Sequence, residues 1–200
     1  MATVENAREL EEQISQVEYD CLKKVFHYID ARKDSRLDAS EISEVLFKLG
    51  YKSTAREIDL MIWEVDDDLD HHVSWEEFLV MYQRCISDKT GLEPRNLFNL
   101  VQFLMYDKDC LGSISVEQTL QILFVRFGRE KLDAEIQEIF GDEQRGADGQ
   151  EKRITFSEYL QRVNARLLKK RSAKPEVTKV QIITKDQKNS VKKFVPALFR

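Results

Sequence analysis

A fourfold repeat constrains this chain more than any other feature of its sequence. Four segments share the order helix, polar or acidic loop, aliphatic residue and helix. The aliphatic residues are spaced 36, 41 and 40 positions apart, and Glu or Gln follows each of them four residues later; they are Leu37, Val73, Ile114 and Ile154. A repeat of this length corresponds to one supersecondary unit that cannot bury its apolar face alone. We therefore expect the four units to pack against one another in pairs.

The segments on both sides of the loops predict helices. Apolar residues recur at the helical period of about 3.6 residues, as in Val17, Cys21, Val25 and Ile29. Charged residues make up 34% of the chain, while Gly and Pro number only 7 and 3, and this mixture favours helices. Nine aromatic residues fall at helical core spacing, where we expect them to be buried: Phe26, Phe47, Trp63, Trp75, Phe78, Phe98, Phe103, Phe124 and Phe127. The pattern predicts an all-α fold of four helix–loop–helix units paired into two lobes.

A polar stretch near the middle of the chain separates the two predicted lobes. It contains Gly91 and is followed by Pro94, and together they disfavour one continuous helix between the lobes. The predicted organisation is an N-terminal extension (1–13), a first pair of units (14–86), a linker (87–93), a degenerate second pair (94–170) and a basic tail (171–200).

Charge is unevenly distributed between the body and the tail. Residues 171–200 carry eight Lys or Arg against two acidic residues, a net charge of +6, which leaves −11 for residues 1–170 from the total of −5. The acidic body disfavours nucleic acid as a partner, whereas the tail suits an acidic filament surface. We interpret the tail either as a solvated flexible segment or as one that becomes ordered on a partner. No apolar run approaches the roughly 20 residues of a membrane span.

The second of the four loops contains the strongest chemical motif. Acidic side chains alternate at its first, third and fifth positions, and a carboxylate stands at its twelfth. Its seventh residue is placed to offer a backbone carbonyl and its ninth a hydroxyl. Calcium is a hard cation that takes six to eight oxygen ligands at this spacing. We predict a calcium site formed by Asp66, Asp68, Asp70, His72, Ser74 and Glu77.

Two residues of this loop depart from the ideal pattern. His71 stands where Gly is preferred, and a left-handed backbone there costs a non-Gly residue about 1–2 kcal/mol. Leu69 places an apolar side chain on the exposed rim. We expect a closed loop with low to moderate calcium affinity. A second interpretation is that Ser74 and Glu77 form a helix capping box without metal, but a cap leaves the three aspartates unexplained.

These motifs resemble those of the calmodulin and troponin C family over about residues 15–168. The resemblance implies an EF-hand fold, in which short β-bridges couple the first loop to the second and the third to the fourth. It also implies a protein that clamps an amphipathic helix of a partner. Residues 58–139 look like EF-hand proteins of cilia and flagella, which implies an axonemal or cytoskeletal partner and location.

The first and third loops match the calcium pattern less well. Arg32 places a cation at the third position of the first loop (30–41), which we predict to bind no metal. The third loop (107–118) lacks an oxygen at its fifth position and has a neutral amide at its twelfth. Its weak candidate ligands are Asp107, Asp109, Ser113 and Gln118.

The fourth loop and the remaining polar residues indicate no further chemistry. Residues 142–158 form a loop that is five residues longer than a calcium loop, and we predict that it binds no calcium. Three cysteines without CxxC spacing favour free thiols in a reducing compartment, and we expect a cytoplasmic protein. No nucleophile, phosphate-binding or zinc-protease motif occurs, so we expect no enzymatic activity.

Two functional classes fit these residues. The first is a structural light chain whose lobes clamp a helix of a larger assembly, largely without regard to calcium. The second is a calcium sensor whose N-terminal lobe opens when the second loop binds its ion. A regulatory subunit of an enzyme is a remote third class. A calcium titration separates the first two, because only the sensor couples binding to a conformational change.

Overall fold

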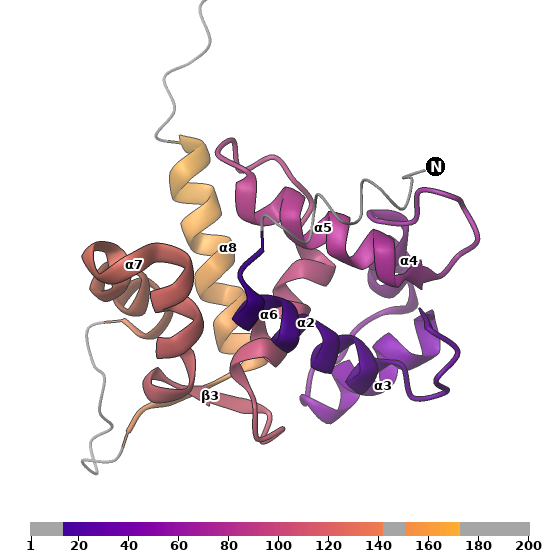
Figure 1. The fold of residues 1–200 in the computed structure, drawn as a ribbon, viewed down its shortest axis with the longest axis horizontal. Coiled ribbons are helices and arrows are strands. Elements are labelled where there is room, and N and C mark those ends of the chain that lie inside the picture. Colours follow the sequence, from indigo (N-terminus) through magenta and orange to yellow (C-terminus); the bar gives the residue numbers. More distant parts are fainter. Residues whose placement is uncertain (1–13, 142–150, 173–200) are drawn as a thin grey trace, which may run out of the picture.

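The computed structural model describes residues 14–141 and 151–172, and these form a helical body (Figure 1). Its helices and strands, in chain order, are α2 (Gln16–Ile29), β1 (Arg36–Leu37), α3 (Ala39–Lys48), α4 (Ala55–Trp63), β2 (Val73–Ser74), α5 (Trp75–Ser87), α6 (Asn96–Tyr106), β3 (Ser113–Ser115), α7 (Val116–Phe140), β4 (Arg153–Thr155) and α8 (Phe156–Ser172). Gly128, at φ 69°, divides α7 into two helical parts, so the described helices form four helix–loop–helix units. The predicted all-α class is confirmed. Within the described ranges, no helix has the length and apolar character of a membrane span.

Side-chain caps fix where the second helix of each unit begins. Asp38, Ser74 and Ser115 stand immediately before α3, α5 and α7, and each side chain accepts the backbone N–H three residues further on. The Glu or Gln at that position bonds back to the cap N–H, which completes a capping box. Thr155 and Glu158 repeat these contacts at α8. The repeated Glu or Gln is therefore a helix-start signal in every unit.

Two short antiparallel ladders join the loops in pairs. β1 pairs with β2, with Leu37 opposite Val73, and β3 pairs with β4, with Ile114 opposite Ile154. All four of these side chains are fully buried. The expected bridges between the first and second loops and between the third and fourth loops are therefore present.

Helix α6 lies at the centre of the body and joins the two pairs of units (Figure 1). Every residue from Leu97 to Tyr106 is buried, as expected for a helix surrounded by protein on all sides. α2 and α4 of the first pair pack on it, as do α7 and α8 of the second pair. Tyr51 and Phe156 meet edge to face across the pairs, with ring centroids 5.5 Å apart. The two pairs thus pack directly against each other. Of the predicted linker 87–93, Ser87 ends α5 and residues 88–93 lie in the connection to α6.

A buried charged cluster also crosses the junction of the two pairs. Arg126 of α7 donates to Glu18 of α2 at 2.9 Å and contacts Tyr82 of α5. Tyr82 donates to the same Glu18 oxygen at 2.9 Å. Burial acts to raise the pKa of Glu18, but the Arg126 charge and hydrogen bonds outweigh it and hold that pKa below its ordinary value. The opposite charges compensate each other inside the body, as buried ions require.

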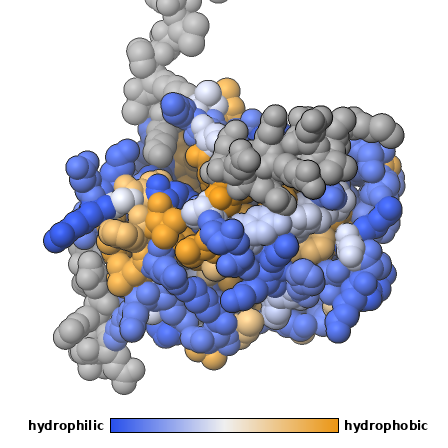
Figure 2. Space-filling model, in the orientation of Figure 1, coloured by the Kyte–Doolittle hydropathy of each residue, from blue (hydrophilic) through white to orange (hydrophobic). Residues whose placement is uncertain are grey.

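Three aromatic residues expected in the core are exposed instead. Phe47 and Trp63 are 81% and 70% exposed, and Phe124 is 53% exposed. Each lies on a helix whose other side already supplies buried residues, so helical spacing alone did not identify the inward face. Phe124 shares an exposed apolar face of α7 with Leu120 and Val125, and Figure 2 shows apolar surface gathered over α7. The prediction that these three aromatic residues belong to the core is wrong.

Candidate metal centre

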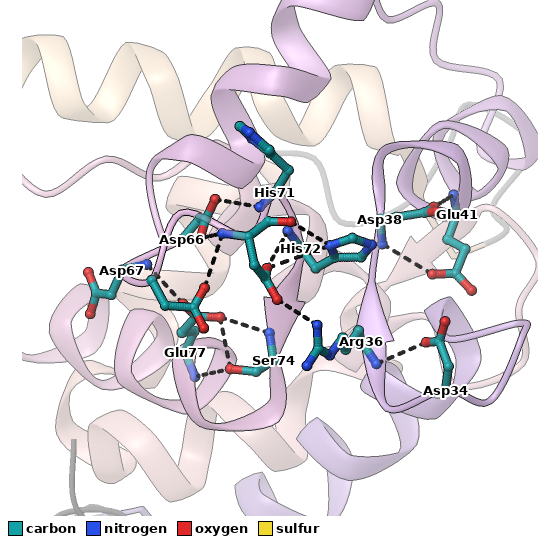
Figure 3. Close-up of polar contacts among 12 residues, drawn as sticks. Asp34, Arg36, Asp38, Glu41, Asp66, Asp67, His71, His72, Ser74 and Glu77 are labelled. Carbon is teal, nitrogen blue, oxygen red and sulfur yellow. Dashed lines mark hydrogen bonds and ion pairs between the residues drawn. The ribbon is translucent and has the colours of Figure 1, made fainter. Parts of the chain in front are cut away.

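The second loop (66–77) brings together the acidic residues that its sequence spacing singled out (Figure 3). It lies between α4 and α5, and Asp66 is buried at its start. Carboxylate oxygens of Asp66, Asp68 and Asp70 lie within 4.8 Å of one another. In the part of the chain that the structure describes, no other three His, Cys, Asp or Glu side chains come so close. Like charges at this spacing repel one another, so the cluster is suited to a cation.

The backbone of the second loop is held closed by its own aspartates. Asp66 accepts the N–H groups of Asp70 at 3.1 Å and His71 at 2.9 Å. Asp68 accepts the same Asp70 N–H at 3.2 Å. Leu69 and His71 adopt left-handed backbones, with φ of 62° and 64°, at a cost of about 1–2 kcal/mol for each non-Gly residue. The loop is therefore closed, as its sequence led us to expect.

Glu77 closes the loop at its far end and caps α5. One of its oxygens accepts the Asp67 N–H at 2.8 Å, and the other accepts the N–H and hydroxyl of Ser74 at 2.9 and 2.8 Å. Figure 3 shows Glu77 between Asp67 and Ser74. The capping box that offered a metal-free interpretation of Glu77 is present, and Glu77 is not one of the three clustered carboxylates. The cap does not involve the three aspartates, so it does not explain why three carboxylates converge in this loop.

A cation from the first unit contacts this cluster. Arg36 of β1 donates to one oxygen of Asp70 at 2.6 Å, and the other oxygen accepts the N–H of His72 at 2.8 Å. The His72 Nδ1 lies 2.8 Å from the Asp70 carbonyl oxygen. Sequence reasoning missed Arg36, although the β1–β2 register, which sets it opposite Ser74, places it at the edge of the second loop. Figure 3 shows Arg36 reaching between the two loops.

The donor set of the second loop fits a calcium ion. It offers the three clustered aspartates together with the Glu77 carboxylate, the Ser74 hydroxyl and the His72 carbonyl, all of which are hard oxygen ligands. Magnesium demands near-ideal octahedral geometry and keeps its water, so a flexible set of this kind suits it less well. Arg36 partly neutralises Asp70 and thereby works against cation affinity.

The first loop holds a side-chain cation instead. The guanidinium of Arg32 forms an ion pair with Asp38, and its Nε lies 3.6 Å from Glu41. The backbone N–H of Arg32 also donates to Glu41 at 3.1 Å. Two carboxylates at ligand positions are thus paired within the protein, and this donor set does not fit calcium.

The third loop is closed by a neutral amide. Gln118 donates to Asp109 at 2.7 Å and accepts from Arg153 of β4 at 3.1 Å. Arg153 also donates to the Ser113 hydroxyl at 3.0 Å. Asp107 accepts two backbone N–H groups of its own loop. Three of the weak candidate ligands, Asp109, Ser113 and Gln118, are therefore hydrogen-bonded to one another or to Arg153, and Asp107 is bonded to the backbone of its loop.

The fourth loop lies mostly outside the described residues. Its first nine residues, 142–150, are not described, so the absence of calcium there stays a prediction. At its end, Glu158 accepts the N–H of Thr155 at 2.8 Å as a helix cap. The N-terminal extension (1–13) and nearly all of the basic tail (173–200) are also outside the described residues.

Comparison with known proteins adds to this geometry. Residues 20–83, which hold the first two units, match the family described as the EF-hand domain pair. The probable calcium-binding protein CML27 of Arabidopsis thaliana is 32% identical over 102 residues, which cover 51% of this chain and 55% of that protein. The probable calcium-binding protein CML25 of Arabidopsis thaliana is 29% identical over 138 residues, covering 69% and 70% of the two chains. The probable calcium-binding protein CML13 of Oryza sativa subsp. japonica is 28% identical over 139 residues, covering 70% and 78%.

These similarities agree with the fold and with the acidic loop. The matched region of the first of these relatives is little more than half of its length. The matched EF-hand pair and the bridged loops thus agree with each other, and the chain is similar to probable calcium-binding proteins of plants.

Proposed function

We propose that this protein binds one calcium ion in its second loop and a helical segment of a partner protein beside that loop. The observation that carries the proposal is the position of Asp66. It belongs to the cluster of three carboxylates and also lines an apolar groove along α4. The similarity to probable calcium-binding proteins supports the choice of ion.

The groove along α4 supports the partner. It has a volume of about 670 Å³ and is lined by the exposed side chains of Leu60, Trp63 and Leu69. Large apolar side chains exposed together are typical of protein interaction sites. An amphipathic helix, which presents apolar residues along one face, is the partner that such a groove accommodates. The charged residues Arg56 and Asp59 also line it and would pair with polar positions of that helix.

A calcium-dependent form of this function is a second candidate. Asp66 and His71 line the groove and also belong to the loop. A shift of the Asp66 carboxylate onto a bound calcium ion would move that wall of the groove, so calcium would alter partner affinity. A static clamp, by contrast, keeps one groove shape with or without calcium.

Calorimetric titration with calcium tests the ion site. We expect one ion to bind with a dissociation constant of roughly 1–10 μM, at the weaker end of the range of sensor loops. Asp66→Asn combined with Glu77→Gln should abolish binding, because both ends of the ligand set are lost. Asp67→Asn is the matched control, since it removes a carboxylate of the same loop that lies outside the cluster. Calcium binding that survives the double change would contradict the choice of this loop.

Fluorescence of Trp63 tests the groove. Its exposed indole reports on burial, whereas Trp75 already packs against Phe78 with ring centroids 5.8 Å apart. A synthetic 20-residue Leu/Lys amphipathic helix should shift the emission to the blue in wild type. Measured by calorimetric titration with the same peptide, Trp63→Ala should bind it more weakly than Leu120→Ala, a change at an exposed apolar residue of α7. Equal binding by all three proteins would exclude this groove, and a shift seen only with calcium favours the sensor.

The finer identity of the partner is proposed from the resemblance of residues 58–139 to EF-hand proteins of cilia and flagella. On that basis the partner helix belongs to an axonemal or cytoskeletal protein, and the protein works in the cytoplasm or axoneme. Pull-down from axonemal extract, with and without chelator, tests this. Failure of the wild type to retain any axonemal protein would contradict the axonemal partner, and equal retention by Trp63→Ala would contradict the groove as its binding site.

A further inference from the structure

We infer that Arg32 is a built-in cation of the first loop, which holds that loop in its closed form and excludes calcium from it. The inference deepens the proposed function. It rests on that function only for the statement that the first pair of units binds one calcium ion, in the second loop. It explains why the first pair of units would take one ion although both of its loops are closed.

Glu41 shows why the first loop needs a cation. This residue is only 4% exposed, and its oxygens accept the N–H groups of Arg32 and Asp38, each at 3.1 Å. A carboxylate buried to this extent requires an opposite charge as well as hydrogen bonds. The Arg32 guanidinium supplies the charge, with Nε 3.6 Å from Glu41 and a terminal nitrogen paired with Asp38. These two carboxylates are the ligand positions nine and twelve of the calcium pattern.

Apart from Arg32, the first loop has the framework of the second. Asp30 accepts the N–H groups of the fifth and sixth loop residues at 3.1 and 3.0 Å, as Asp66 does at 3.1 and 2.9 Å. The sixth residue is left-handed in both loops, with φ of 64° in each. Among the positions that supply side-chain ligands, the loops differ at the third, Arg32 against Asp68, and at the ninth, Asp38 against Ser74. The third position alone replaces an oxygen ligand with a cation, and it therefore separates the two loops most sharply.

Electrostatics explain the exclusion. A dication entering the first loop would meet a guanidinium where the second loop offers a carboxylate, and like charges a few ångströms apart repel. It would also have to displace Arg32 from two carboxylates. The Arg32 side chain is 53% exposed, so water screens the ion pair in part and its contribution to stability is modest. The larger consequence is for selectivity: the loop stays closed and does not respond to calcium.

Calcium titration of Arg32→Asp in the Asp66→Asn, Glu77→Gln background tests the inference, because the second loop has lost both ends of its ligand set there. We expect this variant to bind one ion, using the new carboxylate together with Asp30, Asp34, Asp38 and Glu41. Lys33→Asp in the same background is the matched control: it makes the same charge change one residue away, on an exposed side chain, and should bind none. If Arg32→Asp binds no more calcium than Lys33→Asp in this background, the inference is overturned. A wild type that binds no calcium would instead overturn the proposed function and leave this comparison intact.

Thermal unfolding in calcium-free buffer covers the case in which Arg32→Asp does not fold. Arg32→Gln keeps a polar side chain and removes the charge that faces Glu41. We expect it to lower Tm by about 2–4 °C relative to Lys33→Gln, which removes a charge that faces solvent. Equal Tm values for these two variants would overturn the role of Arg32 in holding the loop.

Discussion

The second and third loops begin alike and end differently. In each, an aspartate at the first position, Asp66 or Asp107, accepts two backbone N–H groups and folds the chain into a loop. In the second loop three carboxylates then converge, whereas in the third Gln118 bonds to Asp109 and Arg153. Closure of the loop is therefore a property of its backbone bonds and helix caps, and ion binding is a property of a few further side chains.

The comparison requires a helical body that is stable without bound ions. Removal of the Arg126 charge should lower the free energy of unfolding of that body more than any other change described below. Arg126→Met would leave Glu18 buried without its cation, which costs about 3–5 kcal/mol. The measurement is the free energy of unfolding in urea with chelator present. Arg129→Met, on an exposed residue three positions further along α7, should change it by less than about 0.5 kcal/mol. Similar losses in both variants would contradict the role of the buried cluster.

The third loop can be changed toward the second to sharpen the comparison. Leu111→Asp with Gln118→Glu restores the missing oxygens at positions five and twelve, and should tighten calcium binding at this loop by roughly 10- to 100-fold. Titration in the Asp66→Asn, Glu77→Gln background isolates the effect. Leu111→Asp alone is the control and should give much weaker binding. An unchanged affinity in the double variant would show that the third loop is closed by something other than its side-chain amide.

The contact between Arg36 and Asp70 predicts a smaller effect on the second loop. Arg36→Gln removes a cation that donates to Asp70 at 2.6 Å, so calcium affinity should rise by about fivefold, or about 1 kcal/mol. Lys33→Gln removes an equal charge from an exposed part of the same first loop and should change affinity by less than about twofold. Equal effects of the two changes would mean that only net charge matters.

Acid should weaken the junction of the two pairs by a small amount. The pKa of Glu18 lies below its ordinary value of 4.5 in the folded protein. Its contribution to stability is therefore complete above pH 4.5 and is lost as pH falls through the folded pKa. Urea unfolding between about pH 6 and pH 3 should show this loss in wild type and less of it in Glu18→Gln. A pH profile that Glu18→Gln leaves unchanged would assign the acid sensitivity to other carboxylates.

Much of the fold could be predicted because the repeat encodes it locally. The pairs Leu37–Val73 and Ile114–Ile154 follow from the 36- and 40-residue spacings, and the caps follow from Ser, Thr or Asp three residues before Glu or Gln. These signals lie within a few residues of the element that they specify. They need no knowledge of how the units pack.

Packing between the units was the part that local patterns could not supply. Glu18 and Arg126 are 108 residues apart, and nothing in either helix marks them as partners. Trp63 and Phe47 lie at helical core spacing yet face outward, because the inward face is decided by neighbouring helices. For the same reason Arg36 was missed, since its contact with Asp70 depends on the strand register and on the path of the second loop. The candidate ligands themselves were found because they lie in one twelve-residue segment.

Residue-resolved NMR with calcium addition tests most directly whether the second loop alone is the ion site. The backbone amides of Ser35, His71 and Gly112 occupy the same position in three loops, and each donates to the first aspartate of its loop. We predict that the His71 amide resonance shifts with one equivalent of calcium, while the Ser35 and Gly112 resonances move far less. A shift of Ser35 or Gly112 that precedes or equals that of His71 would contradict the assignment of the ion to the second loop.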